Sequence, residues 1–103
     1  MNRPKILAEI TGFDCDDHNR FKNWEKHRIP NWECEEIFFN EPLVVRFDAV
    51  HSVDEKRHFA LGHTDSGEKL FVAFTIRNNL IRPVSFRPMT KNEMSIYEHY
   101  KKK

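Results

Sequence analysis

The sequence predicts an α+β fold with two N-terminal helices, a four-stranded antiparallel sheet and a C-terminal helix. Two observations predict this order. Helical spacing with capping residues occurs at both ends of the chain, and the middle contains runs of branched and aromatic residues joined by short turns. The length of 103 residues suits a single domain over 1–103, in which residues 1–12 form an N-terminal extension or a short strand.

Two helices are expected in the first forty residues. In "GFDCDDHNRFKNWEKHRIP", Asp14 or Asp16 can cap the first helix, which ends before Pro30. In "PNWECEEIFFNEP", Asn31 can cap a second, short helix that stops by Pro42. The apolar residues of the second helix share one face, which consists of Cys34, Ile37 and Phe38.

The periodicity then changes to that of strands. Two short connections, "TDSGEK" and "RNNL", favour hairpins and therefore an antiparallel meander. The segment "FVAFTI" is almost wholly apolar, so its strand is expected at the centre of the sheet and covered on both faces. The four predicted strands are "LVVRFDAV", "KRHFALGHT", "KLFVAFTIR" and "LIRPVSFRP".

The last helix is predicted to begin at Thr90. The Thr90 hydroxyl and the Glu93 carboxylate have the spacing of a capping box. Two apolar pairs, Met94 with Tyr97 and Ile96 with Tyr100, give this helix a face to dock. We expect the helices to lie against one face of the sheet, which leaves the other face for a partner or a ligand.

Composition restricts the cellular setting. Lys and Arg number 17 against 16 Asp and Glu, so whole-chain charge does not indicate a nucleic-acid binder. Residues 51–103 hold ten basic and six acidic residues, which permits one modestly basic surface. The two cysteines have no CxxC spacing, and no segment has the length of a membrane span. We therefore expect a reduced, cytoplasmic protein without a membrane partner.

Four segments together resemble the BrnT toxins of bacterial type II toxin–antitoxin modules, whose fold is RelE-like. The similarity covers nearly the whole chain from Phe13 to Tyr100, with the family's order and gaps. The segments are "FDCDDHNRFKNWEKHRI", "EEIFFNEPLV", "HSVDEKRHFALGHTDSGEKLFVAFTIR" and "IRPVSFRPMTKNEMSIYEHY".

The resemblance implies a metal-independent endoribonuclease, without a cofactor, that cleaves messenger RNA and inhibits translation. It also implies a cognate BrnA-like antitoxin with a ribbon-helix-helix region, held in a hetero-oligomer. Operator DNA would be bound only through that antitoxin. The alternative is a catalytically weak or inactive module that acts in antitoxin binding and operon co-repression. This alternative is favoured by Phe86, which stands where the family has Ala.

Three arginines that match family positions are the first catalytic candidates: Arg57, Arg82 and Arg87. A guanidinium can bind two phosphate oxygens and stabilise the charge that develops during RNA cleavage. Arg82 and Arg87 are five residues apart, so a regular strand would point them to opposite faces. Pro83 suggests a bulge that would re-aim the chain between them. Arg87, beside the break at Pro88, is the better candidate for the reacting phosphate.

Several of these residues also have a structural interpretation. Arg82 could instead pair with Glu93, which would hold the last helix to the sheet, or with an acid of the glutamate-rich second helix. Lys26 and His27 match the family's "KH" and are candidates for proton transfer, or they simply favour the C-terminus of the first helix. The candidates for RNA contact are His63, Tyr97, Tyr100 and Lys91, although aromatic residues at helical spacing are more often part of a core. His63 could also act in proton transfer.

A metal site is not expected. His58 and His63 have opposite parity on a strand, and no Cys or carboxylate joins them at ligand spacing. Trp24 and Trp32 are expected either in the core or facing the antitoxin.

Overall fold

The computed structural model describes residues 5–14 and 17–101. In this part of the chain, no helix is long and apolar enough to cross a lipid bilayer. The predicted caps at Asp16 and the start of the N-terminal extension lie outside the described residues. The elements in chain order are η1 (Lys5–Leu7), β1 (Gly12–Phe13), α1 (Asp17–His27), α2 (Asn31–Glu36), η2 (Ile37–Phe39), β2 (Val44–Phe47), β3 (His58–His63), β4 (Lys69–Arg77), β5 (Leu80–Pro88) and α3 (Lys91–Lys101).

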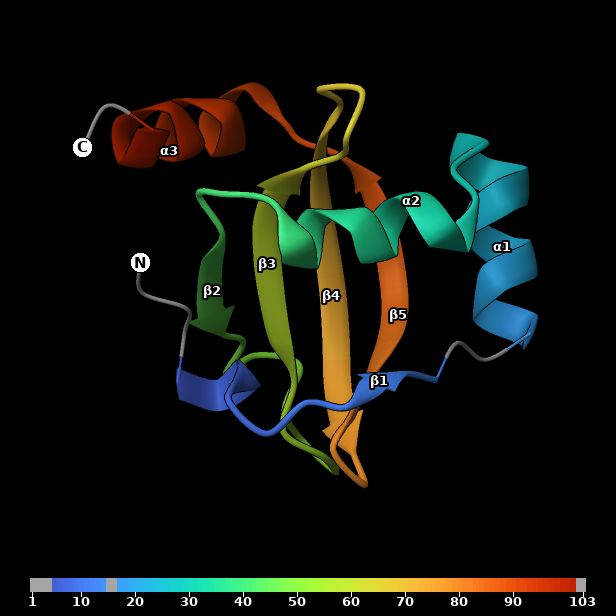
Figure 1. Cartoon of the computed structure of the whole chain (residues 1–103). Helices are drawn as coiled ribbons and strands as arrows, with labels where there is room; N and C mark the ends of the chain where they lie inside the picture. The colour runs from blue at the N-terminus through green and yellow to red at the C-terminus, as the bar shows by residue number, and fades with distance from the viewer. Residues whose placement is uncertain (1–4, 15–16, 102–103) are drawn as a thin grey trace.

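The α+β class is confirmed, and the sheet has one strand more than the four predicted. The described strands form a five-stranded sheet in the order β1-β5-β4-β3-β2 (Figure 1). β1 pairs in parallel with β5 through Gly12 with Leu80 and Phe13 with Ile81, so the sheet is mixed instead of antiparallel. A two-residue strand has too few side chains to show a period of two, so its pairing depended on the tertiary fold.

The two predicted hairpins are confirmed, and their turn residues explain them. Asn78 and Asn79 both have positive φ, 53° and 64°, between β4 and β5. Asparagine tolerates this left-handed region, which a two-residue hairpin turn requires at both positions. Gly67, with a φ of 92°, serves the same purpose between β3 and β4. The prediction that β4 is central is also confirmed.

One core lies between the sheet and the segment of α2 and η2 that crosses it (Figure 1). Cys34, Ile37 and Phe38 are all buried, as their shared face predicted. They pack in one cluster with the inward side chains of β3, β4 and β5. Gly62 lies so close to η2 that an added Cβ would be 2.9 Å from the Cβ of Ile37. The absent side chain at residue 62 therefore lets α2 and η2 lie directly on the sheet.

α3 packs on the opposite face, so the expectation that all helices share one face was wrong. Buried Tyr97 joins a second cluster with Val44, Leu61 and Met89. The helix lies across one end of the sheet, near the β3–β4 hairpin (Figure 1). Its other apolar residues, Met94 and Ile96, stay largely exposed. The C-terminal helix thus leaves the other end of this sheet face uncovered.

Of the caps predicted for α2 and α3, the structure confirms the one at α3. At α3, Glu93 N–H donates to Thr90 Oγ1 (3.2 Å) and Thr90 N–H donates to Glu93 Oε1 (2.9 Å), which confirms the capping box. At α2 the cap position belongs to Pro30, not to Asn31. Asn31 is the first helical residue, and its amide donates to Glu35 at 3.4 Å. Proline is tolerated here because it has no N–H and therefore adds no donor to the N–H groups at the helix start that lack an intrahelical acceptor.

β5 contains the bulge that its prolines suggested. Its register with β4 pairs Ser85 with Ala73 and Pro83 with Phe74, which leaves Val84 as an extra residue. A buried side chain from α1 supports the distorted strand: Asn23 Oδ1 accepts the N–H of Phe86 (3.0 Å) and Asn23 Nδ2 donates to Val84 O (3.4 Å). Asn23 thereby provides at this edge the hydrogen bonds that a neighbouring strand would provide.

Candidate active site

The bulge at Val84 decides where the β5 arginines point. Arg82 is opposite Thr75 and Arg87 is opposite Phe71 in the β4–β5 register. Thr75 and Phe71 are four residues apart on β4, so they share a face, and their partners share it too. The extra residue therefore brings Arg82 and Arg87 to the same side of the sheet, the side on which α3 packs. They lie four residue steps apart, about 14 Å along the strand.

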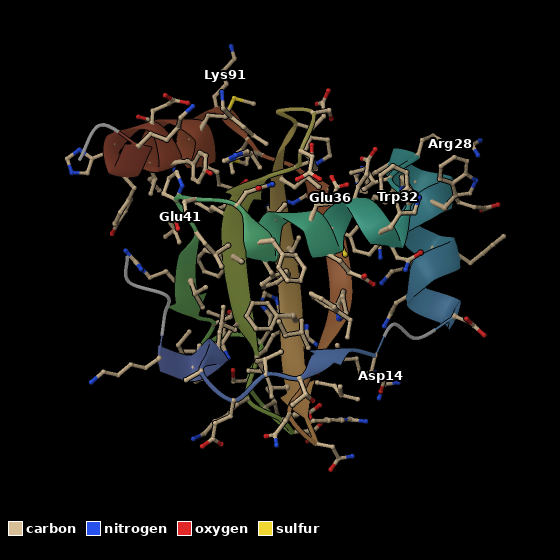
Figure 2. The ribbon with its side chains drawn as sticks, in the orientation of Figure 1. Asp14, Arg28, Trp32, Glu36, Glu41 and Lys91 are labelled. Atoms are coloured by element: carbon tan, nitrogen blue, oxygen red, sulfur yellow. The ribbon has the colours of Figure 1, made fainter. Side chains whose placement is uncertain are left out.

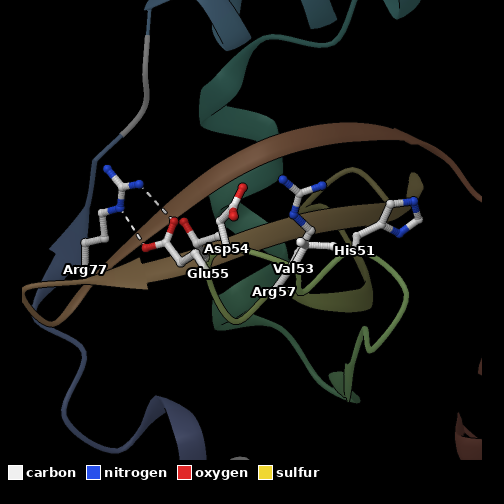
Figure 3. Close-up of a pocket in the computed structure, with 7 residues that line it drawn as sticks. His51, Val53, Asp54, Glu55, Arg57 and Arg77 are labelled. Carbon is white, nitrogen blue, oxygen red and sulfur yellow. Dashed lines mark hydrogen bonds and ion pairs between the residues drawn. The ribbon is translucent and has the colours of Figure 1, made fainter.

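At the uncovered end of this face there is a pocket of about 430 Å³. Its walls come from the β2–β3 loop and from the end of β4 (Figure 3). The residues that line it are His51, Val53, Asp54, Glu55, Arg57, Thr75 and Arg77.

Two polar atoms in this pocket are buried without a hydrogen-bond partner among the described residues, Arg57 Nε and Thr75 Oγ1. A buried donor or acceptor without a partner costs about 1–3 kcal/mol. Such atoms at the wall of a pocket are suited to meet a polar ligand. An anion that reaches Arg57 would meet a cationic donor that the fold leaves unused.

Three arginines surround the same carboxylate at this end of the sheet. Arg77 forms a two-pronged ion pair with Glu55, from Nε at 2.7 Å and from Nη2 at 2.9 Å (Figure 3). The pKa of Glu55 is lowered, first by the hydrogen bond from Arg77 and then by the charges of Arg77, Arg82 and Arg57, while burial opposes the shift. Arg57, Arg77 and Arg82 therefore form one positive cluster, which we call the arginine site.

Arg87 is in a different situation at the covered end. Its Nη1 and Nη2 donate to the two oxygens of Glu93, at 2.8 Å and 2.9 Å, and its guanidinium lies 4.1 Å from the ring centre of Phe71. The pKa of Glu93 is lowered, chiefly by this hydrogen bond. The proposed pairing of Glu93 with Arg82 was wrong, because the β5 register places Arg87 next to α3 instead.

Lys26 and His27 end α1, close to Arg87. The pKa of His27 is lowered, first by burial and then by the positive charges of Lys26 and Arg87. The imidazole is therefore favoured in its neutral form. Lys26 is exposed beside it. The structure thus brings His27 near Arg87 and away from the pocket-lining residues.

The four candidates for RNA contact fall into two groups. Tyr97 is fully buried and donates to Pro42 O, while His63 Nδ1 lies 2.7 Å from the Tyr97 hydroxyl. Burial raises the pKa of Tyr97 to about 12, with a smaller contribution from Glu98, so the hydroxyl remains a donor at neutral pH. Tyr97 therefore has no free ring face for a base, and His63 is bound to the core. Tyr100 is half-buried against Arg46, and Lys91 is exposed at the start of α3 (Figure 2).

Phe86 does not crowd the arginines. It faces the opposite side of the sheet from Arg87 and is fully buried in the first core.

His58 and His63 lie on opposite faces of the sheet, since His58 stacks on Phe74 while His63 forms a hydrogen bond with Tyr97. Among the described residues, no three His, Cys, Asp or Glu side chains form a group that could hold a metal ion.

Sequence reasoning missed Arg77, Thr75 and the role of the β2–β3 loop. Alternation on β4 could have found the first two, because residues 71, 73, 75 and 77 share the face of the candidate arginines. Trp24 and Trp32, which were expected in the core or facing the antitoxin, are both exposed, and the Arg28 guanidinium lies over the Trp24 ring. Arg28 and Trp32 lie near the junction of α1 and α2 (Figure 2).

Comparisons with known proteins agree with this architecture. Residues 15–93 match the family described as the ribonuclease toxin BrnT of type II toxin–antitoxin systems. The crystal structure of the Brucella abortus ribonuclease toxin BrnT is similar, with a TM-score of 0.56 and 17% identity, over 78% of this chain and 97% of that one. A search among curated proteins finds no match. The chain therefore belongs to the BrnT family of ribonuclease toxins of type II toxin–antitoxin systems.

Proposed function

We propose that this chain is an active, RelE-like and metal-independent endoribonuclease that cleaves messenger RNA and inhibits translation in the cytoplasm. The observation that supports this most is the arginine site, in which a buried guanidinium nitrogen of Arg57 has no partner among the described residues. Arginines placed at a reacting phosphate can stabilise the transition-state charge that a metal ion would otherwise neutralise.

The RNA would run along the sheet face on which Arg82 and Arg87 both lie. Arg57 and Arg82 are our leading candidates for the reacting phosphate, and Arg77 joins them when RNA competes with Glu55. Arg87 lies further along this face and His27 is near it at the end of α1. Arg87, His27 and Lys26 are candidates for neighbouring phosphates, and Lys91 and Tyr100 on α3 are further candidates for RNA contact. Phosphate contacts of this kind are independent of base sequence and weaken as salt is added.

We further propose that a BrnA-like antitoxin with a ribbon-helix-helix region neutralises this activity in a hetero-oligomer and alone contacts operator DNA. Family membership implies an antitoxin partner. The exposed Phe21, Trp24 and Trp32 support a protein contact on α1 and α2, because large aromatic side chains are enriched in interfaces.

A second candidate function is a weak or inactive module that binds antitoxin and co-represses the operon. One observation favours it: Arg77 and Arg87 are both already paired with carboxylates of the same chain, Glu55 and Glu93. In that case the arginine site would no longer bind or cleave RNA.

Two experiments decide between these functions. Induced expression without antitoxin should arrest growth, and co-expression of the antitoxin should restore it. The purified protein should cleave single-stranded RNA in the presence of EDTA, and an all-deoxy oligonucleotide of the same sequence should stay intact because it lacks the 2′-hydroxyl. Normal growth together with intact RNA would overturn the enzyme proposal and support the inactive module.

A further inference from the structure

The β2–β3 loop has a fixed shape. Asp48 N–H donates to Arg57 O at 2.8 Å, which joins the two ends of the loop. The Ser52 hydroxyl donates to Asp48 O and accepts the N–H of Arg57 at 2.8 Å. The loop therefore holds His51 and Arg57 in the wall of the same pocket (Figure 3).

Within this loop, Asp48 orients the imidazole of His51. His51 Nδ1 lies 2.8 Å from Asp48 Oδ2, and His51 N–H donates to Asp48 Oδ1 at 3.3 Å. The pKa of Asp48 is lowered, since the hydrogen bonds from the side chain and backbone of His51 outweigh the opposing effect of burial. An ionised carboxylate can only accept, so Nδ1 must carry the hydrogen. A neutral ring in this tautomer has its lone pair on Nε2.

The exposures of the two side chains differ in the way that a catalytic pair requires. The Asp48 side chain is 17% exposed, whereas that of His51 is 62% exposed. The carboxylate is thus held within the loop, while the imidazole remains accessible to a large substrate. The same division, with a buried carboxylate behind an accessible imidazole, serves nucleophile activation in unrelated hydrolases.

We propose that His51 is the general base of RNA cleavage and that Asp48 is the residue that positions it. This inference rests on the proposed ribonuclease function. His51 Nε2 removes the proton from the ribose 2′-hydroxyl, and the 2′-oxygen forms a bond to phosphorus. The bond from phosphorus to the 5′-oxygen breaks, leaving a 2′,3′-cyclic phosphate. The 5′-oxygen takes a proton from water, and the hydroxide so formed is neutralised by the proton that His51 holds.

The groups around the imidazole suit this step. Asp48 faces it within the loop, and the charged side chains that share the pocket wall are Asp54, Glu55, Arg57 and Arg77. Arg57, which lies between His51 and Arg77 in the close-up (Figure 3), can hold the phosphate while Nε2 meets the 2′-hydroxyl of the same nucleotide. The alternative is that the Asp48–His51 pair only stabilises the turn. Substituting either residue would then lower the stability of the protein without affecting proton transfer.

The test uses the purified full-length protein and an RNA oligonucleotide with a single ribose at the cleavage site and 2′-deoxy sugars elsewhere. His51→Gln should lower kcat by about 100-fold with little change in KM, in the range of general base catalysis. It should also change the shape of the pH–rate profile, because the ionisation of the general base no longer controls the rate. The matched control is His99→Gln, which changes an exposed histidine of α3 and should cleave like the wild type.

Two further variants separate catalysis from structure. His51→Ala should regain cleavage when imidazole is added to the buffer, because free imidazole can supply the missing base. Asp48→Asn should lower kcat less than His51→Gln, since an amide can hold the ring in the wrong tautomer. A lower Tm in His51→Ala without rescue by imidazole would show a turn-capping pair and overturn the proposal.

The outcomes distinguish this inference from the proposed function. If His51→Gln retains the wild-type rate and pH profile while Arg57→Ala is inactive, the ribonuclease function stands and His51 is not its base. If the wild-type protein cleaves no RNA, the function and the assignment of the base are both wrong.

Discussion

The two ends of one sheet face place their arginines in opposite circumstances. At the end covered by α3, Arg87 gives two guanidinium nitrogens to Glu93 and lies against Phe71. At the uncovered end, Arg57 Nε is buried with no partner in the described part of the chain. An arginine with its donors satisfied holds the fold together, whereas one with an unused donor beside a pocket is available to a ligand. The same residue type on the same face is thus paired with a carboxylate at one end and has a nitrogen without a partner among the described residues at the other.

The largest effect is expected at Arg57. Arg57→Ala should lower the kcat for RNA cleavage by about 10²–10³-fold, because it removes a donor aimed at developing negative charge. Arg57→Lys should recover only part of this, since an ammonium lacks the two-pronged geometry. Cleavage of a labelled RNA oligonucleotide measures the effect, with circular dichroism as a check of folding.

The control for Arg57 is Lys22→Ala, which removes one positive charge from the exposed surface of α1. It should cleave like the wild type apart from a small change in salt dependence. If Arg57→Ala stays active while Arg87→Ala is inactive, the comparison of the two ends is reversed.

A smaller effect is expected at the covered end, on stability. Tyr97→Phe should reduce the free energy of unfolding by about 1–3 kcal/mol, because His63 Nδ1 and Pro42 O both lose a buried partner. Urea unfolding measures this loss. Tyr100→Phe is the matched change on the same helix and should cost less, since Tyr100 is only half-buried. Weaker RNA binding by Tyr97→Phe at unchanged stability would place Tyr97 in the RNA surface after all.

The smallest effect is expected from the ion pair at this end. Glu93→Gln should cost about 1 kcal/mol at pH 7, because the substitution keeps the capping geometry and removes only the charge facing Arg87. The pKa of Glu93 is lowered in the folded state, so its contribution is present above its unfolded pKa of about 4.3 and is lost as pH falls through the folded value.

Urea unfolding at pH 7 and at pH 3 tests this dependence. The difference between the wild type and Glu93→Gln should be smaller at pH 3 than at pH 7, because the contribution of the carboxylate charge is lost as Glu93 becomes protonated. Glu98→Gln is the matched control on the same helix, where the ion pair with Lys69 is more exposed and should contribute less. A constant difference between the wild type and Glu93→Gln at both pH values would mean that the charge of Glu93 is not what stabilises α3.

The regular elements were predictable because each depends on local chemistry. Runs of branched and aromatic residues located β4 and β5, and the spacing of Thr90 and Glu93 located the start of α3. The active-site candidates were predictable only in part. Arg57 and Arg82 were named from the sequence, but the pairing of Arg87 with Glu93 was not, because it depends on which residue of β5 faces α3. Asp48 and His51 are three residues apart, as in many turns, so their sequence did not indicate a catalytic pair. Only the folded loop shows that His51 lies in the wall of a pocket.

The sequence by itself determined the α+β class, the hairpins and the capping box, because propensity, turn chemistry and hydrophobic period act between near neighbours. Pro83 also signalled an irregular strand. Only the tertiary structure decided that the extra residue is Val84, since a bulge is defined by the register of two strands. That register turned Arg82 and Arg87 to one face, where α3 covers one end and the pocket of the arginine site lies at the other.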